Sequence, residues 1–171
     1  LLLQYLNEQE EAVLWVGDNH LTISFKQATI FSRVIDERYP DYKTVLPKDN
    51  NKVLTAARED LLASVRRVSI FSNRATRQVE LKLSNGEAVV TTEDPESASS
   101  AKEKIEVGYE GDDLTLGFNA NYLVDILSHI STDKVVIRLN TPISATLVEP
   151  DKQGENEENT MLLMPMRTGS E

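Results

Sequence analysis

Few residues of this chain have the type and spacing needed for chemistry. Ser99 and Lys102 stand in the order Ser-x-x-Lys, which supplies a serine nucleophile and a lysine base in some acyl-transferring enzymes. The pair lies in an acidic stretch, without a helix-opening apolar context and without a later Lys-Thr-Gly. A hydrolase that uses these two residues is therefore only a third hypothesis.

Other arrangements for catalysis or metal binding are absent from the sequence. There is no cysteine, and the two histidines, His20 and His129, are far apart. Glu59 and Asp60 are adjacent, so on a helix they point about 100° apart and cannot share a proton. The seven glycines are scattered and form no phosphate-binding loop. We expect no catalytic residue, no metal and no cofactor.

The composition is that of an acidic globular protein. The 171 residues include 18 Lys plus Arg against 28 Asp plus Glu, a net charge of −10. This charge argues against indiscriminate coating of nucleic acid, although it does not describe any single face. No apolar run reaches the roughly 18 residues of a membrane span, and no secretory leader is visible. Because Leu1 falls within a predicted helix end, we expect a fragment. We also expect a cytoplasmic location.

The first part of the chain is predicted to be rich in strands. Alternating apolar residues from Leu21 to Phe25 are typical of a strand with one buried face. Pro40 and Pro47 then exclude a regular helix or a central strand, so we place a domain boundary there, between residues 1–41 and 42–171. One helix end and three strands are predicted, over residues 1–7, 12–17, 21–26 and 28–35.

The second part is predicted to combine two helices with a sheet. The helix at residues 57–71 places Leu61, Leu62, Val65 and Val68 on its buried face. Asn119 caps the helix at residues 119–130, whose predicted buried residues are Leu123, Ile126, Leu127 and Ile130. Strands are predicted at residues 52–55, 78–83, 87–92, 104–109, 114–118, 135–139, 143–148 and 160–166. The Asn85-Gly86 pair predicts a hairpin, and residues 92–100 and 150–159 are predicted to be solvated acidic loops.

One supersecondary pattern occurs twice. A helix followed by three strands is predicted both at residues 1–35 and at residues 122–166. Such repetition suggests tandem copies of one domain, the first of them cut short.

Two apolar features suggest binding surfaces. Ile70 lies opposite the buried face of its helix, which leaves either a lone exposed isoleucine or a subunit contact. Residues 161–167 are apolar on both faces and contain all three methionines. Methionine is flexible and suits pockets that accept varied partners, but a buried last strand remains the alternative.

Three motifs together resemble the bacterial sliding-clamp family, the β subunit of the replicative DNA polymerase III. They are YPDYKTVLP at residues 39–47, GFNANY at 117–122 and MPMR at 164–167, in the order of the family. The likeness extends over nearly the whole chain. It implies an α+β DNA-clamp fold, with antiparallel sheets outside and two helices per domain on the inner face.

The resemblance also implies an organisation and a set of partners. Residues 1–41 correspond to the end of the middle clamp domain and residues 42–171 to the last domain. Two full-length protomers join head to tail in a ring around duplex DNA, and the ring binds polymerase subunits, the clamp loader and repair proteins through short linear motifs. No catalysis and no membrane association are implied.

Site residues are carried over by their matching positions. Ring-interface residues are Arg67, Ile70 and Phe71, and loose phosphate contacts in the channel are expected from Lys52, Arg58 and Arg66. Thr44 departs from the arginine that the family often has at its position. The peptide pocket is expected to comprise Pro40, Thr44, Val45, Tyr122, Ile143, Leu162, Met164, Pro165, Met166 and Arg167.

We therefore predict a processivity-clamp fragment. The alternative is a stand-alone, β-rich adaptor domain that binds peptides without any DNA ring. Helices 57–71 and 119–130 packed side by side on one face would favour the clamp, whereas opposite faces would favour the adaptor.

Overall fold

The computed structural model describes residues 11–26 and 28–168 of the chain. The helix end predicted at residues 1–7, and residues 169–171, lie outside the described residues. The chain divides into two compact units, Leu1–Tyr42 and Lys43–Glu171, each with its own sheet.

The first unit holds a three-stranded antiparallel sheet in chain order. Its strands are β1 (Val13–Val16), β2 (His20–Phe25) and β3 (Ala28–Arg33), close to the predicted ranges. Phe25 is the one fully buried hydrophobic residue among those described in this unit. Leu14 and Trp15 point to opposite faces of β1 and are both exposed. This sheet therefore leaves apolar side chains uncovered on both faces within its own unit.

The second unit is built on one eight-stranded antiparallel sheet. Its strand order is β11-β10-β9-β4-β7-β6-β5-β8. The strands are β4 (Lys52–Ala57), β5 (Gln78–Ser84), β6 (Glu87–Asp94), β7 (Ser99–Tyr109), β8 (Leu114–Asn119), β9 (Lys134–Leu139), β10 (Thr146–Pro150) and β11 (Met161–Leu163). The 3-10 turn η2 (Tyr42–Thr44) lies at the division between the units, where the two prolines excluded regular structure.

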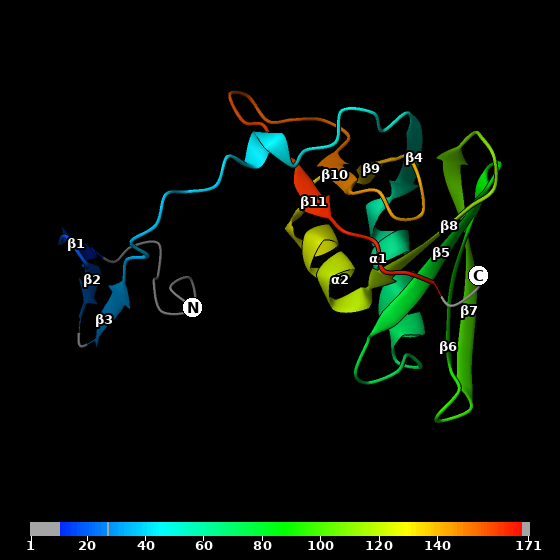
Figure 1. Cartoon of the computed structure of the whole chain (residues 1–171), viewed down its shortest axis with the longest axis horizontal. Helices are drawn as coiled ribbons and strands as arrows, with labels where there is room; N and C mark the ends of the chain where they lie inside the picture. The colour runs from blue at the N-terminus through cyan, green and yellow to red at the C-terminus, as the bar shows by residue number, and fades with distance from the viewer. Residues whose placement is uncertain (1–10, 27, 169–171) are drawn as a thin grey trace. The chain divides into compact units, whose positions relative to one another are not determined.

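Two helices pack side by side against this sheet. Figure 1 shows α1 (Arg58–Ser69) and α2 (Ala120–His129) next to each other, on the inner side of the curled strands. Leu61 and Val65 of α1 and Leu127 of α2 are each 0 % exposed and belong to one continuous core. Such burial of one apolar stripe per helix stabilises both helices more than their intrinsic propensity does.

Local sequence signals explain where the helices begin. The Asn119 side chain accepts a hydrogen bond from the Asn121 N–H at 3.0 Å, so the predicted cap of α2 is confirmed. Helix α1 has no side-chain cap; instead the Arg58 N–H donates to the Asp133 carbonyl at 2.8 Å. The acidic residues Glu59 and Asp60 in its first turn complement the helix dipole.

Strands β6 and β7 correct one loop prediction. They extend through most of residues 92–100, which were predicted to be a solvated loop, and leave only residues 95–98 as a turn. The buried Asp94 carboxylate accepts hydrogen bonds from the Ser97 hydroxyl and the Asn73 amide, and these bonds lower its pKa. Composition suggested a solvated segment, but a local bond from Ser97 and a long-range bond from Asn73 tie this carboxylate to the rest of the unit.

The C-terminal strand is shorter than predicted. β11 ends at Leu163 rather than at residue 166, because Pro165 offers no N–H to continue the ladder. Residues 164–168, here called the C-terminal segment, then leave one edge strand of the sheet and reach the other. There the Met166 N–H donates to the Gly117 carbonyl of β8 at 2.7 Å. The segment thus spans between the two ends of the strand order.

Candidate functional site

An apolar groove lies between α2 and the C-terminal part of the chain. Its volume is about 560 Å³. We call it the α2 groove; its lining residues are Asn119, Tyr122, Asp125, Ile126, Leu162, Leu163, Met164 and Met166.

Helical spacing positions one wall of the α2 groove. Tyr122 and Ile126 are four residues apart, so they lie on one face of α2, and Asn119 is the residue that caps the start of this helix. Strand β11 and the C-terminal segment supply the other wall. Tyr122 and Met164 are 64 % and 58 % exposed, so the groove is open to a partner.

Four of the predicted pocket residues line this groove: Tyr122, Leu162, Met164 and Met166. Met164 and Met166 are therefore accessible, whereas Met161 is partly buried and packs against the core. The other residues assigned by resemblance are not part of the described lining. Pro165 lies between the lining residues Met164 and Met166, and Arg167 follows them directly. Thr44, Val45 and Ile143 are other residues of the second unit, and Pro40 is an exposed residue of the first unit.

The structure adds four residues to the groove that the resemblance did not assign. Ile126 was predicted to be buried in the core, but it is only half-buried and lines the groove. Asn119, Asp125 and Leu163 are the others. For Asp125 and Ile126 the sequence signal was their spacing of three and four residues from Tyr122, whereas no such spacing pointed to Leu163.

A second candidate surface is the C-terminal end of α1. Ile70 and Phe71 are 73 % and 45 % exposed there. The Arg67 guanidinium donates to both carboxylate oxygens of Glu103 on β7, at 2.7 and 2.8 Å. This hydrogen bonding raises the pKa of Arg67 and lowers the pKa of Glu103. The ion pair thereby connects the last turn of α1 to β7 at an exposed position.

The three basic residues assigned to a DNA channel have different surroundings. Arg66 is exposed and donates to the Ser128 hydroxyl of α2 at 3.2 Å. The Arg58 side chain is 18 % exposed and donates to the Thr132 carbonyl, and the Lys52 ammonium donates to the Asn140 carbonyl. Arg66 is thus the most accessible of the three for a loose phosphate contact.

The arrangement of Ser99 and Lys102 is unsuitable for nucleophilic catalysis. Both lie on β7 and are three residues apart, so their side chains point to opposite faces of the strand. The Ser99 hydroxyl donates to the Phe71 carbonyl at 3.1 Å. A base on the opposite face cannot accept its proton.

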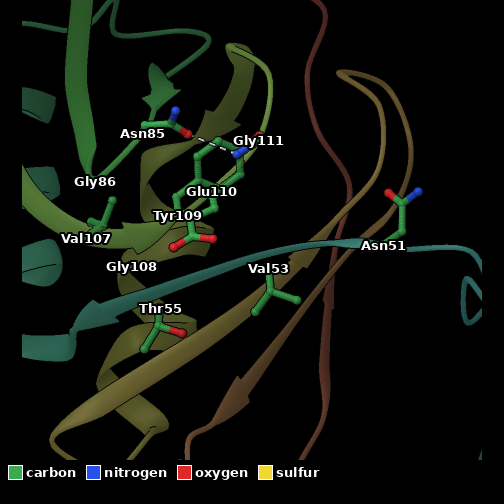
Figure 2. Close-up of a pocket in the computed structure, with 10 residues that line it drawn as sticks. All are labelled: Asn51, Val53, Thr55, Asn85, Gly86, Val107, Gly108, Tyr109, Glu110 and Gly111. Carbon is green, nitrogen blue, oxygen red and sulfur yellow. Dashed lines mark hydrogen bonds between the residues drawn. The ribbon is translucent and has the colours of Figure 1, made fainter.

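A hollow of about 880 Å³ lies beside β7, where the pairing of this strand changes from β6 to β4. Figure 2 shows a hydrogen bond between Asn85 and Gly111 at the rim of this hollow. The Gly111 N–H donates to the Asn85 Oδ1 atom at 3.1 Å. The Tyr109 hydroxyl donates to the Asp112 carbonyl, and burial raises the pKa of this tyrosine. Of the ten lining residues only Glu110 is charged, so the hollow offers no set of groups for catalysis.

The described residues offer neither a metal site nor a membrane-spanning helix. No group of three or more His, Asp or Glu side chains among them could hold a metal ion. Neither described helix is long and apolar enough to cross a membrane.

Comparison with known proteins identifies related sequences. The family model described as DNA polymerase III beta subunit, C-terminal domain, matches residues 43–167. The beta sliding clamp of Pseudomonas aeruginosa is 34% identical over 167 residues, 97% of this chain and 44% of that protein. The beta sliding clamp of Caulobacter vibrioides is 35% identical over 159 residues, 92% of this chain and 41% of that protein. The chain thus spans less than half the length of these relatives.

Solved structures agree with the sequence comparison. The DNA polymerase III subunit beta of P. aeruginosa superposes with a TM-score of 0.82 at 33% identity, covering 98% of this chain and 45% of that one. A sliding clamp from P. aeruginosa bound to griselimycin gives a TM-score of 0.80 at 33% identity, covering 98% and 44%. The predicted clamp fold is therefore confirmed, and the chain belongs to the family of the DNA polymerase III beta subunit, the bacterial sliding clamp.

Proposed function

We propose that this chain is the part of a DNA sliding clamp that captures short peptides from replication and repair proteins. The observation that supports this function best is the α2 groove, with Tyr122, Met164 and Met166 around an open apolar hollow. Aromatic, thioether and aliphatic walls suit an extended peptide that carries Leu and Phe side chains.

The area available in the groove fits weak, exchangeable binding. Burial of about 300 Å² of apolar surface at ~25 cal/mol/Å² contributes a gross stabilisation of ~7 kcal/mol. Ordering of the peptide and loss of its overall freedom offset part of this. Weak, readily reversible binding is therefore expected, which lets polymerase subunits, the clamp loader and repair proteins exchange on one groove.

In the full-length protein we propose that two protomers form a head-to-tail ring around duplex DNA in the cytoplasm. Arg67, Ile70 and Phe71 contribute to the subunit contact, and Arg66 contributes a weak phosphate contact in the channel. Such contacts read charge and not base sequence, as sliding requires. The protein then acts as a non-catalytic processivity factor.

The alternative is a stand-alone peptide-binding adaptor without a DNA ring. The side-by-side packing of α1 and α2 supports the clamp over this alternative, since the adaptor hypothesis expected helices on opposite faces.

Titration of a fluorescein-labelled peptide ending in Leu-Phe tests the groove. Met164→Ala combined with Pro165→Ala should abolish binding by the 171-residue chain and leave its circular dichroism spectrum unchanged. Val53→Ala, in the hollow of Figure 2, is the matched control and should bind like the unmodified chain. Equal affinity of the double variant and the unmodified chain would contradict the assignment.

A further inference from the structure

Gly117 is fully buried, although the other residues on its face of β8 are only half-buried. Leu116 and Phe118 point into the core, so Gly117 faces the other way together with Thr115 and Asn119. Those two residues are half-buried, whereas Gly117 is fully buried. The atoms nearest to a side chain at Gly117 belong to the C-terminal segment and to Gln78, so the segment is what covers this position.

Two hydrogen bonds hold the C-terminal segment on this edge of the sheet. The Met166 N–H donates to the Gly117 carbonyl at 2.7 Å, the shorter of the two. The Gln78 amide on the adjacent strand β5 donates to the Arg167 carbonyl at 3.3 Å. β8 is the last strand in the sheet order, so its outer main-chain groups are free to accept such a partner.

The approach at Gly117 leaves no space for a side chain. A Cβ atom there would lie 2.8 Å from the Met166 carbonyl oxygen, and 3.0 Å from both Gln78 Nε2 and Thr168 Cγ2. The Met166 oxygen is a main-chain atom, so it can move away only if the segment itself moves. Glycine is required here for close approach and not for a positive φ angle.

The segment held in this way carries two side chains of the α2 groove, Met164 and Met166. Methionine has three rotatable bonds, so its side chain adapts, but its position depends on a fixed main chain. We propose that Gly117 is a positioning residue for the α2 groove: by lacking a side chain it lets Met166 bridge to β8, which holds the methionine wall in place for the peptide. This inference rests on the proposed peptide-binding function.

Gly117→Ala tests the inference in the 171-residue chain with the same Leu-Phe peptide. The variant should bind roughly tenfold more weakly, because the methionine wall shifts. Hydrogen exchange of the Met166 amide, followed by NMR, should become about tenfold faster, because its bond to Gly117 is lost. The double variant with Met166→Ala should bind no more weakly than the weaker single variant, since Gly117 acts through Met166.

Gly108→Ala is the matched control within the same sheet. Its added Cβ would meet Thr55 at 3.6 Å, an ordinary contact, and it lies away from the groove. We expect unchanged peptide affinity and unchanged Met166 protection. Gln78→Ala is a milder second variant that removes only the bond to the Arg167 carbonyl, so it guards against misfolding of Gly117→Ala. It should weaken binding by about threefold.

The outcomes separate this inference from the proposed function. No binding by the unmodified chain would contradict the function, whereas Met166 exchange would still report on the bridge. Normal peptide affinity in both Gly117→Ala and Gln78→Ala would overturn the positioning role. So would an affinity loss in Gly117→Ala with the Met166 amide still protected, or an equal loss in Gly108→Ala.

Discussion

The α2 groove and the end of α1 both expose apolar side chains, but they are built differently. The groove is a hollow whose walls come from α2 and from residues 162–166, about forty positions apart in the chain. The end of α1 is one continuous stretch, where Ile70 and Phe71 are exposed beside the Arg67–Glu103 ion pair. The groove is assembled from segments distant in sequence, whereas the two apolar residues at the end of α1 are adjacent in sequence.

This difference indicates different partners. A hollow of about 560 Å³ encloses only a few side chains, which suits a narrow extended peptide. Exposed apolar residues beside an ion pair suit a broad protein surface, where the apolar residues are covered and a charged rim sets the orientation. The two surfaces should therefore respond independently to substitution.

The largest expected effect is on the end of α1. Ile70→Asp in a full-length protein containing this region should convert dimers to monomers, because a carboxylate buried without a partner costs roughly several kcal/mol. Peptide affinity of the groove should stay the same. Sedimentation velocity measures the change, and dimers that persist would exclude Ile70 from the subunit contact.

The next effect distinguishes a core residue of α2 from a residue that lines the groove. Leu123, 2 % exposed, lies in the core, whereas Ile126 lines the groove. Leu123→Ala should lower the free energy of unfolding by about 2–5 kcal/mol in urea denaturation. Ile126→Ala should lower it by only about 1 kcal/mol and mainly weaken peptide binding. The same loss of stability in both variants would show that Ile126 is a core residue.

A smaller effect should appear with pH at the ion pair of α1. The hydrogen bond from Arg67 holds the pKa of Glu103 below its ordinary value of 4.5 in the folded state. The stabilisation is therefore complete above that ordinary value and is lost as the pH falls through the folded pKa. Glu103→Gln should destabilise the chain slightly at about pH 6, and the difference should shrink toward about pH 3. If the stability difference between Glu103→Gln and the unmodified chain grew as the pH fell, the predicted direction would be wrong.

The smallest effect tests whether the two surfaces are coupled. The hydrogen bond from Arg66 to Ser128 joins α1 to α2 at an exposed position. Arg66→Ala should change the unfolding free energy by less than about 0.5 kcal/mol. Ser128→Ala removes the same bond from the other side and serves as its control. A change in peptide affinity in either variant would show that the helices transmit an effect to the groove.

Much of the fold could be predicted from local patterns. The buried stripe of α1, the Asn119 cap and the Asn85-Gly86 hairpin all depend on neighbours within a few residues, and each appears in the structure. The ordering of Asp94 could not be predicted in this way. Its partner Asn73 lies 21 residues away in the sequence, and no local pattern predicts that contact.

The candidate site was predicted only in part for the same reason. Sequence resemblance identified Tyr122 and the methionines of the C-terminal run, but it did not identify Ile126, whose pattern is that of a core residue. Whether such a residue faces the core or a hollow depends on which segment packs against its helix.

The amino-acid sequence by itself determined the elements of this protein, its acidic character, its clamp-like motifs and its lack of a cysteine or a histidine pair. The tertiary structure alone decided that the C-terminal segment crosses to β8 and meets Gly117. The physical reason is that a groove forms only where segments distant in the sequence lie next to each other. The periodicity of apolar residues predicts which side chains are buried on one face of a helix or strand. Which of them stay accessible to a partner depends on how a segment distant in the sequence packs against that face.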